Sequence, residues 1–516
     1  MKVDYSLYLV TDSTQGILGD RDLTSVVQAA VEGGVTVVQY RDKTSGTAEL
    51  IRTAKKLHQV TKAASIPLLI NDRLDVALAM GAEGVHIGQD DIDLPTARRL
   101  LGKAAIIGVT ANSVQEAVKA VEDGADYLGI GTVYATPTKE DTKSIIGPAG
   151  VRDILTEIAA ISDNVATVCI GGINASNIQR VLYQSQSRLN SLDGVAVVSA
   201  IMASSDPTGA ARTLRSLIAT QPLFATIQAS NALITNVVKI EGPRIIQALV
   251  TQSPLCHNMT NLVVQNFAAN VALAIGASPI MSNNGAEAAD LAKLGGSLVV
   301  NMGTVTSDGL SNYLQALRAY NAVGGPTLFD PVGAGATQQR RDAVKTLMAG
   351  GYFDVIKGNE GEIKTVAGMA GAQQRGVDSG ASTLSLEEKA RLVQQLATRE
   401  RNIVLMTGKV DVISDGRRTY AISNGHELLG SITGSGCTLG TTIASVLAVH
   451  RSDKLLAAVT GILLYEIAAE QAVSCGNAHG PGTFIPAFLD RLYHIRTVDV
   501  PAGTGFENAK IKNIIA

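Results

Sequence analysis

The sequence predicts an α/β protein of two domains, an eight-stranded (β/α)8 barrel followed by an open and mostly parallel sheet with helices on both faces. Two observations support this prediction. The 516 residues are too many for one ordinary hydrophobic core. Short apolar runs alternate with helical patterns along the first part of the chain, and after a lapse a second set of apolar runs follows.

The barrel is predicted from the regularity of the first alternation. Eight strand-like runs, each followed by a segment of helical periodicity, are typical of a TIM barrel. The runs cover residues 5–12, 35–42, 66–72, 84–89, 104–110, 126–134, 165–172 and 194–200.

The second domain is predicted from later strand-like runs separated by helical patterns, which indicate a sheet with helices on both faces. These runs cover residues 297–303, 326–333, 354–359, 402–408 and 411–416. Because the alternation lapses around residues 220–243, we expect the barrel domain over 1–225, a linker over 226–242 and the second domain over 243–516.

Composition narrows the class of protein. Hydrophobic residues make up 46% and charged residues 17%, a globular balance, and the net charge of −3 gives no reason to expect a nucleic-acid or membrane partner. The four cysteines stand far apart without a CxxC pair, which favours a reducing compartment over a disulfide framework or structural zinc. With no signal-like N-terminus and no uncharged apolar run of transmembrane length, we expect a cytoplasmic protein with small-molecule partners.

Polar residues follow the strands of the predicted barrel, at the end where the active site of a barrel lies. Asp72 and Asp91 end the third and fourth runs, and carboxylates are ligands that Mg²⁺ prefers. Arg41, Lys43 and Lys139 are cations suited to a polyphosphate. A salt bridge or a strand cap would explain each residue alone, but their shared position favours a site for magnesium and a phosphorylated substrate.

The last two runs of the barrel end in CIGGIN (169–174) and VVSAI (197–201), where barrels commonly bind phosphate through backbone N–H groups. These segments belong to an ordered set of motifs that resembles the thiamine-phosphate synthases. The other members are QYRDK (39–43), NDR (71–73), GVHIGQDD (84–91), IGVT (107–110) and ATPTKEDTK (135–143).

The resemblance implies that the barrel couples hydroxymethylpyrimidine diphosphate to a thiazole phosphate and releases pyrophosphate. It implies that Mg²⁺ is held by Asp72 and Asp91. The residues it assigns to the pyrimidine diphosphate are Gln39, Arg41, Lys43, Asn71, Thr110 (at a place that is often Ser) and Lys139. The residues it assigns to the thiazole phosphate are Thr136, Thr138, Gly172, Val198 and Ser199.

The implied coupling needs no side-chain nucleophile. An aminopyrimidine can stabilise a carbocation as pyrophosphate leaves, and the thiazole nitrogen then attacks. The site must therefore stabilise the departing charge and align the two partners. His86 lies within an apolar run, and we expect a packed core histidine there.

In the second domain a glycine-rich segment, TGSGC (433–437), precedes a long apolar helical pattern. Its glycines allow a tight turn whose N–H groups face an anion, and the helix adds the positive end of its dipole. Alone, the segment would equally be a glycine turn before a core helix with a buried cysteine. It belongs, however, to an ordered set that resembles the hydroxyethylthiazole kinases of the ribokinase-like superfamily, together with HNMTNLVVQNFAANVALAIGASPIMS (257–282), NMGT (301–304), FDPVGAGAT (329–337) and IKGNEGEI (356–363).

This second resemblance implies a ribokinase-like α/β domain that transfers phosphate from ATP to the primary alcohol of the thiazole. The residues it assigns to the thiazole are Met281, Gly434 and Asn261, and those it assigns to ATP are Thr407 and Lys357, where related enzymes often carry Arg. Candidate carboxylates on the magnesium side are Asp330 and Glu362.

Cys437 stands where most of that superfamily has an Asp base. A helix N-terminus lowers the pKa of a thiol, so we expect a lowered pKa for Cys437. We infer that this residue is catalytic and removes or orients the proton of the substrate hydroxyl.

Three alternatives stay open from the sequence. The barrel could be a thiazole tautomerase, which the pyrimidine-side residues disfavour. The second domain could be another ribokinase-like enzyme such as a pyrimidine kinase, but HNMTN (257–261) and Cys437 favour the thiazole. A non-catalytic sensor of vitamin precursors is disfavoured by the intact phosphate and magnesium ligands. The resembled enzymes self-associate, so we expect a homo-oligomer built on a trimer, with a hexamer as one form.

Overall fold

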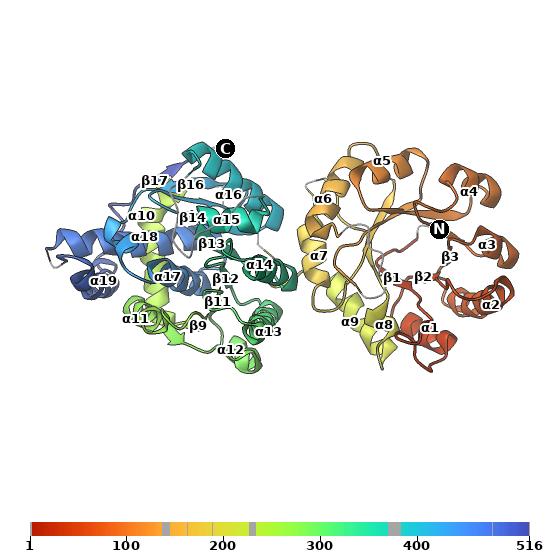
Figure 1. Cartoon of the computed structure of the whole chain (residues 1–516), viewed down its shortest axis with the longest axis horizontal. Helices are drawn as coiled ribbons and strands as arrows, with labels where there is room; N and C mark the ends of the chain where they lie inside the picture. The colour runs from red at the N-terminus through yellow and green to blue at the C-terminus, as the bar shows by residue number, and fades with distance from the viewer. Residues whose placement is uncertain are drawn as a thin grey trace. The chain divides into compact units, whose positions relative to one another are not determined.

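The computed structural model of the chain describes residues 3–136, 145–162, 164–187, 189–225, 234–369, 383–476 and 478–514. Two compact units make up the chain, Met1–Pro222 and Leu223–Ala516, and Figure 1 shows both.

The first unit is a closed barrel in which each of eight parallel strands pairs with the next along the chain and β8 pairs with β1, which confirms the predicted (β/α)8 fold. The strands are β1 (Leu7–Val10), β2 (Val37–Tyr40), β3 (Leu68–Asn71), β4 (Gly84–Ile87), β5 (Ile106–Ala111), β6 (Tyr127–Gly131), β7 (Ala166–Ile170) and β8 (Gly194–Val197). The helices around them (Figure 1) are α1 (Leu23–Glu32), α2 (Thr47–Ala63), α3 (Leu74–Met80), α4 (Leu94–Leu101), α5 (Val114–Glu122), α6 (Gly147–Ile158), α7 (Ile178–Ser185), α8 (Ser199–Met202) and α9 (Pro207–Ala219).

Side chains of the barrel strands alternate between two cores, as the period of a strand requires. Those that point outward, such as Leu9 and Val38, pack against the helices. Those that point inward fill the barrel around Tyr8, Leu69 and Tyr127. The interior is therefore packed with side chains, and polar groups reach solvent only at its ends.

Two glycines make room for polar rings in this interior. A Cβ atom on Gly108 would lie 1.9 Å from Cζ of Tyr127, and one on Gly129 would lie 2.8 Å from Cε1 of His86. Real Cβ atoms do not approach other atoms so closely, so β5 and β6 need glycine at these positions for the two rings to fit.

The second unit contains a nine-stranded sheet in the order β10-β9-β11-β12-β13-β14-β15-β16-β17. Pairing is parallel from β10 to β14 and antiparallel from β14 to β17, which confirms the open, mostly parallel sheet. The strands are β9 (Leu255–Met259), β10 (Ser278–Ile280), β11 (Ser297–Asn301), β12 (Thr327–Asp330), β13 (Val355–Asn359), β14 (Ile403–Thr407), β15 (Asp411–Ser414), β16 (Thr419–Ile422) and β17 (Ile511–Asn513).

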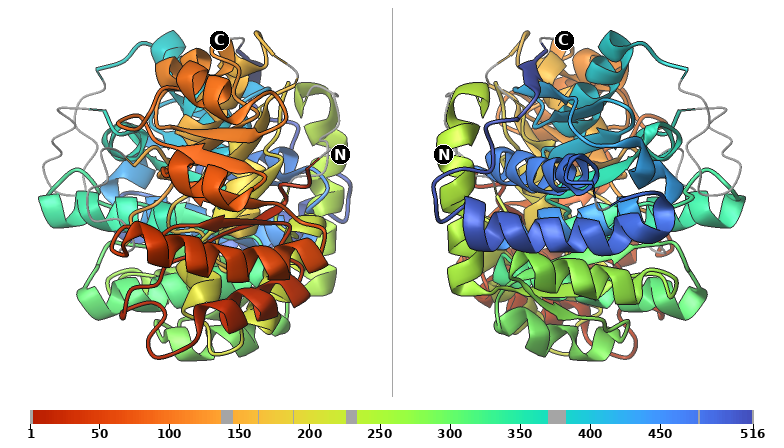
Figure 2. Two further views of the ribbon diagram at one scale, coloured as in Figure 1. Left: turned by 90° about the vertical axis from the view of Figure 1, so that its right-hand side faces the viewer. Right: turned by 90° about the vertical axis from the view of Figure 1, so that its left-hand side faces the viewer.

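Helices cover both faces of this sheet (Figure 1). One face shares a hydrophobic core with α10 (Ile234–Gln252), α11 (Gln265–Ile275), α17 (Ser435–Val449), α18 (Lys454–Ser474) and α19 (Pro481–His494). The other face packs against α12 (Ala288–Lys293), α13 (Ser307–Val323), α14 (Gln338–Gly350), α15 (Glu360–Ala367) and α16 (Leu386–Glu400). In the right-hand view of Figure 2, α11 and α19 lie side by side in an outer layer.

Helix α18 is long and apolar. Within the part of the chain that the structure describes, it is the one helix long and apolar enough to cross a membrane, and 83% of its most apolar window is buried inside the protein. That burial is typical of a core helix, here packed against α17 and α19.

The junction between the units differs from the predicted linker. The first unit ends at Pro222, close to the expected boundary, and residues 226–233 lie outside the described residues. From Ile234 onward the expected linker forms the start of α10, where Ile234 and Val238 are buried in the core of the second unit. Pro243, the last residue of the segment in which the alternation lapses, stands inside α10.

Candidate active sites

The predicted barrel residues that the structure describes lie at or just after the carboxyl ends of the strands. They are Gln39, Arg41 and Lys43 at β2, Asn71 and Asp72 at β3, Asp91 after β4, Thr110 at β5, Thr136 after β6, Gly172 after β7, and Val198 and Ser199 after β8. Thr138 and Lys139 lie outside the described residues. The described residues are thus placed at one end of the barrel, where a site can form.

An acidic pair marks this end of the barrel. Asp72 has a left-handed backbone with a φ of 61°, which a non-glycine residue adopts at some cost, and its N–H donates to the carbonyl of His86 at 2.9 Å. Its carboxylate lies 3.2 Å from the Lys43 ammonium and interacts with the Asp91 carboxyl. Burial and the Asp91 carboxyl raise the pKa of Asp72, while Lys43 opposes them.

This pair fits a divalent cation that keeps several other ligands. Two carboxylates so close together repel unless a proton or a cation lies between them. No cluster of three or more acidic, His or Cys side chains suited to a metal occurs among the described residues. The chain would therefore supply two carboxylates, and water and substrate phosphate would complete the coordination that Mg²⁺ needs.

A chain of hydrogen bonds starts at the predicted pyrimidine-binding residue Asn71. Its Oδ1 accepts from Nε2 of Gln39 at 2.5 Å, and Oε1 of Gln39 accepts from the Tyr8 hydroxyl at 2.9 Å. The hydroxyls of Tyr8 and Tyr127 lie 2.7 Å apart. Burial raises the pKa of both phenols well above the usual value, so both keep their protons at neutral pH.

The chain of hydrogen bonds continues through His86 to a second predicted residue. Nδ1 of His86 lies 2.8 Å from the Tyr127 hydroxyl, and Nε2 lies 2.9 Å from Oγ1 of Thr110. The sequence suggested only a packed histidine here, whereas the structure connects its ring to the mouth of the barrel. Tyr8, Tyr127 and His86 were not predicted as functional residues, because aromatic residues in apolar strands are usually core.

The barrel segments that are predicted to bind phosphate have closely packed backbones. Gly172 has a left-handed backbone with a φ of 65°, and a Cβ atom there would lie 2.9 Å from the carbonyl oxygen of Ala135. The turn after β7 thus packs directly on the segment that leads to Thr136. Val198 and Ser199 follow β8, which pairs with β7.

In the second unit the glycine-rich segment forms the beginning of α17, as predicted. Gly434 is the N-cap with a φ of 89°, and a Cβ atom there would lie 2.6 Å from Cγ2 of Val264. Both the backbone conformation and the space therefore require glycine. Cys437 follows in the first turn of the helix.

Beneath this turn, polar side chains connect four of the predicted residues. Nδ2 of Asn261 donates to Oδ1 of Asn301 at 3.1 Å and lies 3.6 Å from Sγ of Cys437. Nδ2 of Asn301 and Nζ of Lys357 both donate to Oδ2 of Asp330, at 3.0 and 3.1 Å. Asn301 lies in the NMGT motif, but the sequence did not indicate its connecting role.

Buried charge dominates this second site. Burial opposes the charge of Lys357, but Asp330, Cys437 and Glu362 outweigh it and raise the pKa of the ammonium. Burial also raises the pKa of the Asp330 carboxyl, whose Oδ1 has no hydrogen-bond partner. Burial and Asp330 raise the pKa of Glu362 to about 7. An unpartnered carboxylate oxygen beside a second carboxyl fits an additional cation, so these two residues could hold Mg²⁺.

The expected pKa of Cys437 is wrong in direction. Burial and the neighbouring Asp330 raise the pKa of its thiol to about 11, although Lys357 and Asn301 oppose them. Desolvation of the partly buried thiol and the nearby Asp330 carboxyl act against the lowering expected at a helix N-terminus. The thiol therefore keeps its proton at neutral pH.

Met281 and Thr407, the two remaining residues predicted for the kinase site, lie near these side chains. Met281 follows β10, and Nδ2 of Asn283 donates to the carbonyl of Thr260 at 3.2 Å, which places the segment after β10 beside the loop that carries Asn261. Thr407 ends β14 and is in register with Asn359, two residues after Lys357.

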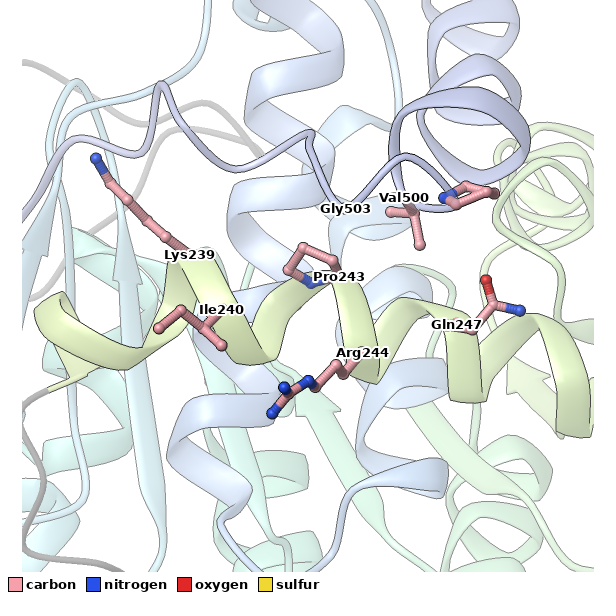
Figure 3. A pocket seen from close by; sticks show the side chains of 8 residues that line it. Lys239, Ile240, Pro243, Arg244, Gln247, Val500 and Gly503 are labelled. Carbon is pink, nitrogen blue, oxygen red and sulfur yellow. The ribbon is translucent and has the colours of Figure 1, made fainter.

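A cavity of about 430 Å³ lies between α10 and the segment after α19 (Figure 3). Arg244, one of its two cations, is paired with Glu241 at 2.7 Å. None of the predicted site residues is among those that line it, which are Lys239, Ile240, Pro243, Arg244, Gln247, Val500, Pro501 and Gly503.

Both units of the chain are similar to known proteins. The hydroxyethylthiazole kinase family matches residues 246–497, and thiamine monophosphate synthase matches residues 7–201. A probable thiamine biosynthetic bifunctional enzyme of Schizosaccharomyces pombe is 45% identical over 518 residues, with 99% of each chain covered. The thiamine biosynthetic bifunctional enzyme of Saccharomyces cerevisiae is 38% identical over 528 residues, with 96% of each covered. Among solved structures, the hydroxyethylthiazole kinase protein of Pyrococcus horikoshii OT3 is 34% identical with a TM-score of 0.46, over 53% of this chain and 99% of its own.

Proposed function

Because this chain belongs to the family of bifunctional thiamine biosynthetic enzymes, with a thiamine-phosphate synthase domain and a hydroxyethylthiazole kinase domain, we propose that its two sites act in sequence on one thiazole. The second unit phosphorylates the alcohol of hydroxyethylthiazole with ATP. The first unit joins the resulting phosphate to hydroxymethylpyrimidine diphosphate and releases pyrophosphate and thiamine phosphate. The four free cysteines support a cytoplasmic location.

The acidic pair beside Lys43 is the observation that supports the synthase assignment. Asp72 and Asp91 would hold Mg²⁺, which would supply positive charge beside the pyrophosphate, and Arg41, Lys43 and Lys139 neutralise the charge of that leaving group. Gln39, Asn71 and Thr110 orient the pyrimidine at the strand ends. The thiazole phosphate is held by Thr136, Thr138, Gly172, Val198 and Ser199. Positioning and charge neutralisation are then the whole of the catalysis.

The kinase assignment is supported by the buried Lys357–Asp330 pair beneath the glycine turn. The N–H groups that begin at Gly434 cradle the transferring phosphoryl group, and Asn261 and Met281 contact the thiazole. ATP is contacted by Lys357 and Thr407, and Mg²⁺ is held on the side of Asp330 and Glu362. Because the pKa of the Cys437 thiol is about 11, this residue orients the substrate hydroxyl as a protonated thiol and does not remove its proton.

We also propose that the enzyme is a homo-oligomer built on a trimer, with a hexamer as its full form. Leu262 and Val263 follow Asn261 directly and are 70% and 74% exposed. Apolar side chains so exposed beside a polar site favour coverage by a neighbouring subunit. Light scattering should give a mass that is a multiple of three chains, and a monomer or dimer would contradict this proposal.

One turnover assay tests the proposed function. The enzyme is incubated with ATP, Mg²⁺, hydroxyethylthiazole and hydroxymethylpyrimidine diphosphate, and thiamine phosphate should form. Omission of ATP should stop its formation, and addition of the thiazole phosphate should restore it. Product that forms without either ATP or the thiazole phosphate would contradict the proposed order.

A further inference from the structure

In the chain of hydrogen bonds that runs from Asn71 to Thr110, the donor and acceptor roles are fixed, because each group has few protons to donate. A phenol has one proton, and a neutral imidazole has one N–H and one lone pair. The amide of Gln39 sets the direction at one end. Its Nε2 donates to Asn71, and its Oε1 accepts the proton of Tyr8.

The donor and acceptor roles of the remaining groups follow from those of Gln39. Since the proton of Tyr8 is directed at Gln39, the contact between the two phenols must use the proton of Tyr127. Tyr127 has no second proton, so its oxygen must accept from Nδ1 of His86. A neutral imidazole with a proton on Nδ1 has a lone pair on Nε2, which accepts the proton of Thr110.

The two ends of the chain therefore show opposite polarity at the barrel mouth. Oγ1 of Thr110 has given its proton to His86 and offers lone pairs. Oδ1 of Asn71 is used by Gln39, so Asn71 offers the N–H groups of Nδ2. Gly108 and Gly129 independently indicate that this arrangement is built into the strands, because any side chain there would displace the rings of Tyr127 and His86.

We propose that this hydrogen-bond chain makes the pyrimidine subsite selective for an aminopyrimidine over its oxo counterpart. An aminopyrimidine presents an N–H₂ donor beside a ring nitrogen that accepts, which matches an acceptor at Thr110 and a donor at Asn71. The oxo form presents a carbonyl and a ring N–H, which reverses both partners. Tyr8, Tyr127 and His86 are positioning residues that act through Asn71 and Thr110. The inference rests on the proposed function, in which Asn71 and Thr110 face the pyrimidine.

Competitive inhibition measures this selectivity without the chemical step. The monophosphates of the aminopyrimidine and of its oxo counterpart are used as inhibitors of the full chain, and the ratio of their inhibition constants is compared among variants. Tyr127→Phe cuts the chain and frees Thr110 to donate, so the ratio should fall about 10-fold, the equivalent of one hydrogen bond. Tyr8→Phe should change the ratio in the same direction.

The matched control is Tyr5→Phe. Tyr5 packs on Tyr127 with ring centroids 5.0 Å apart, but its hydroxyl takes no part in the chain between Asn71 and Thr110. This variant should keep the wild-type ratio, and all three variants should keep the KM for the thiazole phosphate. An unchanged ratio in Tyr127→Phe, or equal losses for both inhibitors together with a raised thiazole KM, would overturn the inference.

Nitrogen NMR of the full chain with isotope-labelled histidine tests the direction itself. The His86 signals, assigned with His86→Gln, should show a protonated Nδ1 and an unprotonated Nε2 in the free enzyme. The opposite tautomer, or protons on both nitrogens, would overturn the inference. An enzyme that forms no thiamine phosphate contradicts the proposed function, whereas an active enzyme with no preference between the two inhibitors contradicts only the selectivity.

Discussion

The two candidate sites handle charge in opposite ways. In the barrel, the charged pair stands at the mouth, where the Lys43 side chain is 61% exposed and that of Asp72 is 22% exposed, and the interior holds phenol, amide and imidazole groups. In the second unit, Lys357 and Asp330 are 5% and 0% exposed. Solvent screens the first pair, whereas the second is held in a dry interior. The kinase charges are therefore structural as well as chemical, whereas the synthase charges are chiefly chemical.

The largest difference should follow removal of Lys357. Lys357→Met leaves the buried Asp330 without its cation, and breaking a buried pair in this way typically costs about 3–5 kcal/mol. The second unit should lose this much stability, and kinase turnover should be lost. Urea unfolding followed by hydrogen exchange of peptides from α17 and α18 measures the stability.

Two controls accompany this variant. Lys293→Met removes an exposed partner of Asp290 at 3.1 Å and should leave the stability of the second unit unchanged. Synthase activity on supplied thiazole phosphate should also persist in Lys357→Met. Unaltered stability of the second unit would show that the buried pair is not structural.

The next effect concerns the synthase alone. Asp72→Asn removes one carboxylate from the proposed magnesium site, and synthase kcat/KM should fall on the order of 100-fold because charge stabilisation of the leaving group is lost. Kinase activity and the stability of the barrel should change little, since Asp72 is partly exposed. Asp75→Asn, which alters a surface pair with Arg73, is the control. A variant with normal activity at limiting Mg²⁺ would exclude Asp72 as a ligand.

A smaller effect is a pH dependence of the stability of the second unit. The pKa of Glu362 is raised to about 7 in the folded protein from an ordinary value of 4.5, so the folded state binds the proton more tightly than the unfolded state. The stabilising contribution of this proton is complete below pH 4.5 and is lost as the pH rises towards 7.

Glu362→Gln should remove this loss, which is on the order of 1–3 kcal/mol across that interval. The stability of the second unit is compared with that of the wild type between these pH values, without ATP or Mg²⁺. Asp411→Asn provides a comparison, because burial raises the pKa of Asp411 to about 6. Parallel curves for the wild type and Glu362→Gln would contradict the assignment of the slope to Glu362.

The smallest effect is expected at Cys437. Cys437→Ser should lower kinase turnover roughly 10-fold by altering how the substrate hydroxyl is held, while ATP affinity stays the same. Because the pKa of the thiol is about 11, wild-type turnover should not follow thiol ionisation between about pH 7 and 9. Unchanged turnover in the serine variant would remove Cys437 from the mechanism, and a rate that rises with each pH unit would restore the thiolate.

The fold could be predicted where local pattern and burial agree. Seven of the eight barrel strands lie within the predicted runs, and β5 ends one residue beyond its run, because parallel strands buried on both faces appear as apolar segments. Strands β9, β10, β16 and β17 were not predicted. In β9, His257 and Asn258 are polar yet fully buried, and β17 has only three residues, so neither has the apolar pattern of a strand.

For the two sites, the sequence predicts which residue types gather at the strand ends, but not how their side chains interact. The positions of Asp72, Asn71 and Thr110 at strand ends follow from the barrel topology, which the sequence indicates. The raised pKa of Cys437 could not be predicted, because it depends on burial and on Asp330, which lies on a different element. Tyr8 and Tyr127 could not be predicted as site residues either, because they stand among apolar residues in the sequence. Only the fold brings their hydroxyls together inside the barrel.

In the proposed function, two separate sites, one in each unit, share one thiazole phosphate. Mixing Asp72→Asn with Lys357→Met tests it most directly, with ATP, Mg²⁺, hydroxyethylthiazole and hydroxymethylpyrimidine diphosphate supplied. Each variant alone should form almost no thiamine phosphate, and the mixture should form it, because one variant keeps the kinase and the other keeps the synthase. A mixture that stays inactive, or full activity in either variant alone, would show that the two sites do not share the thiazole phosphate in this way.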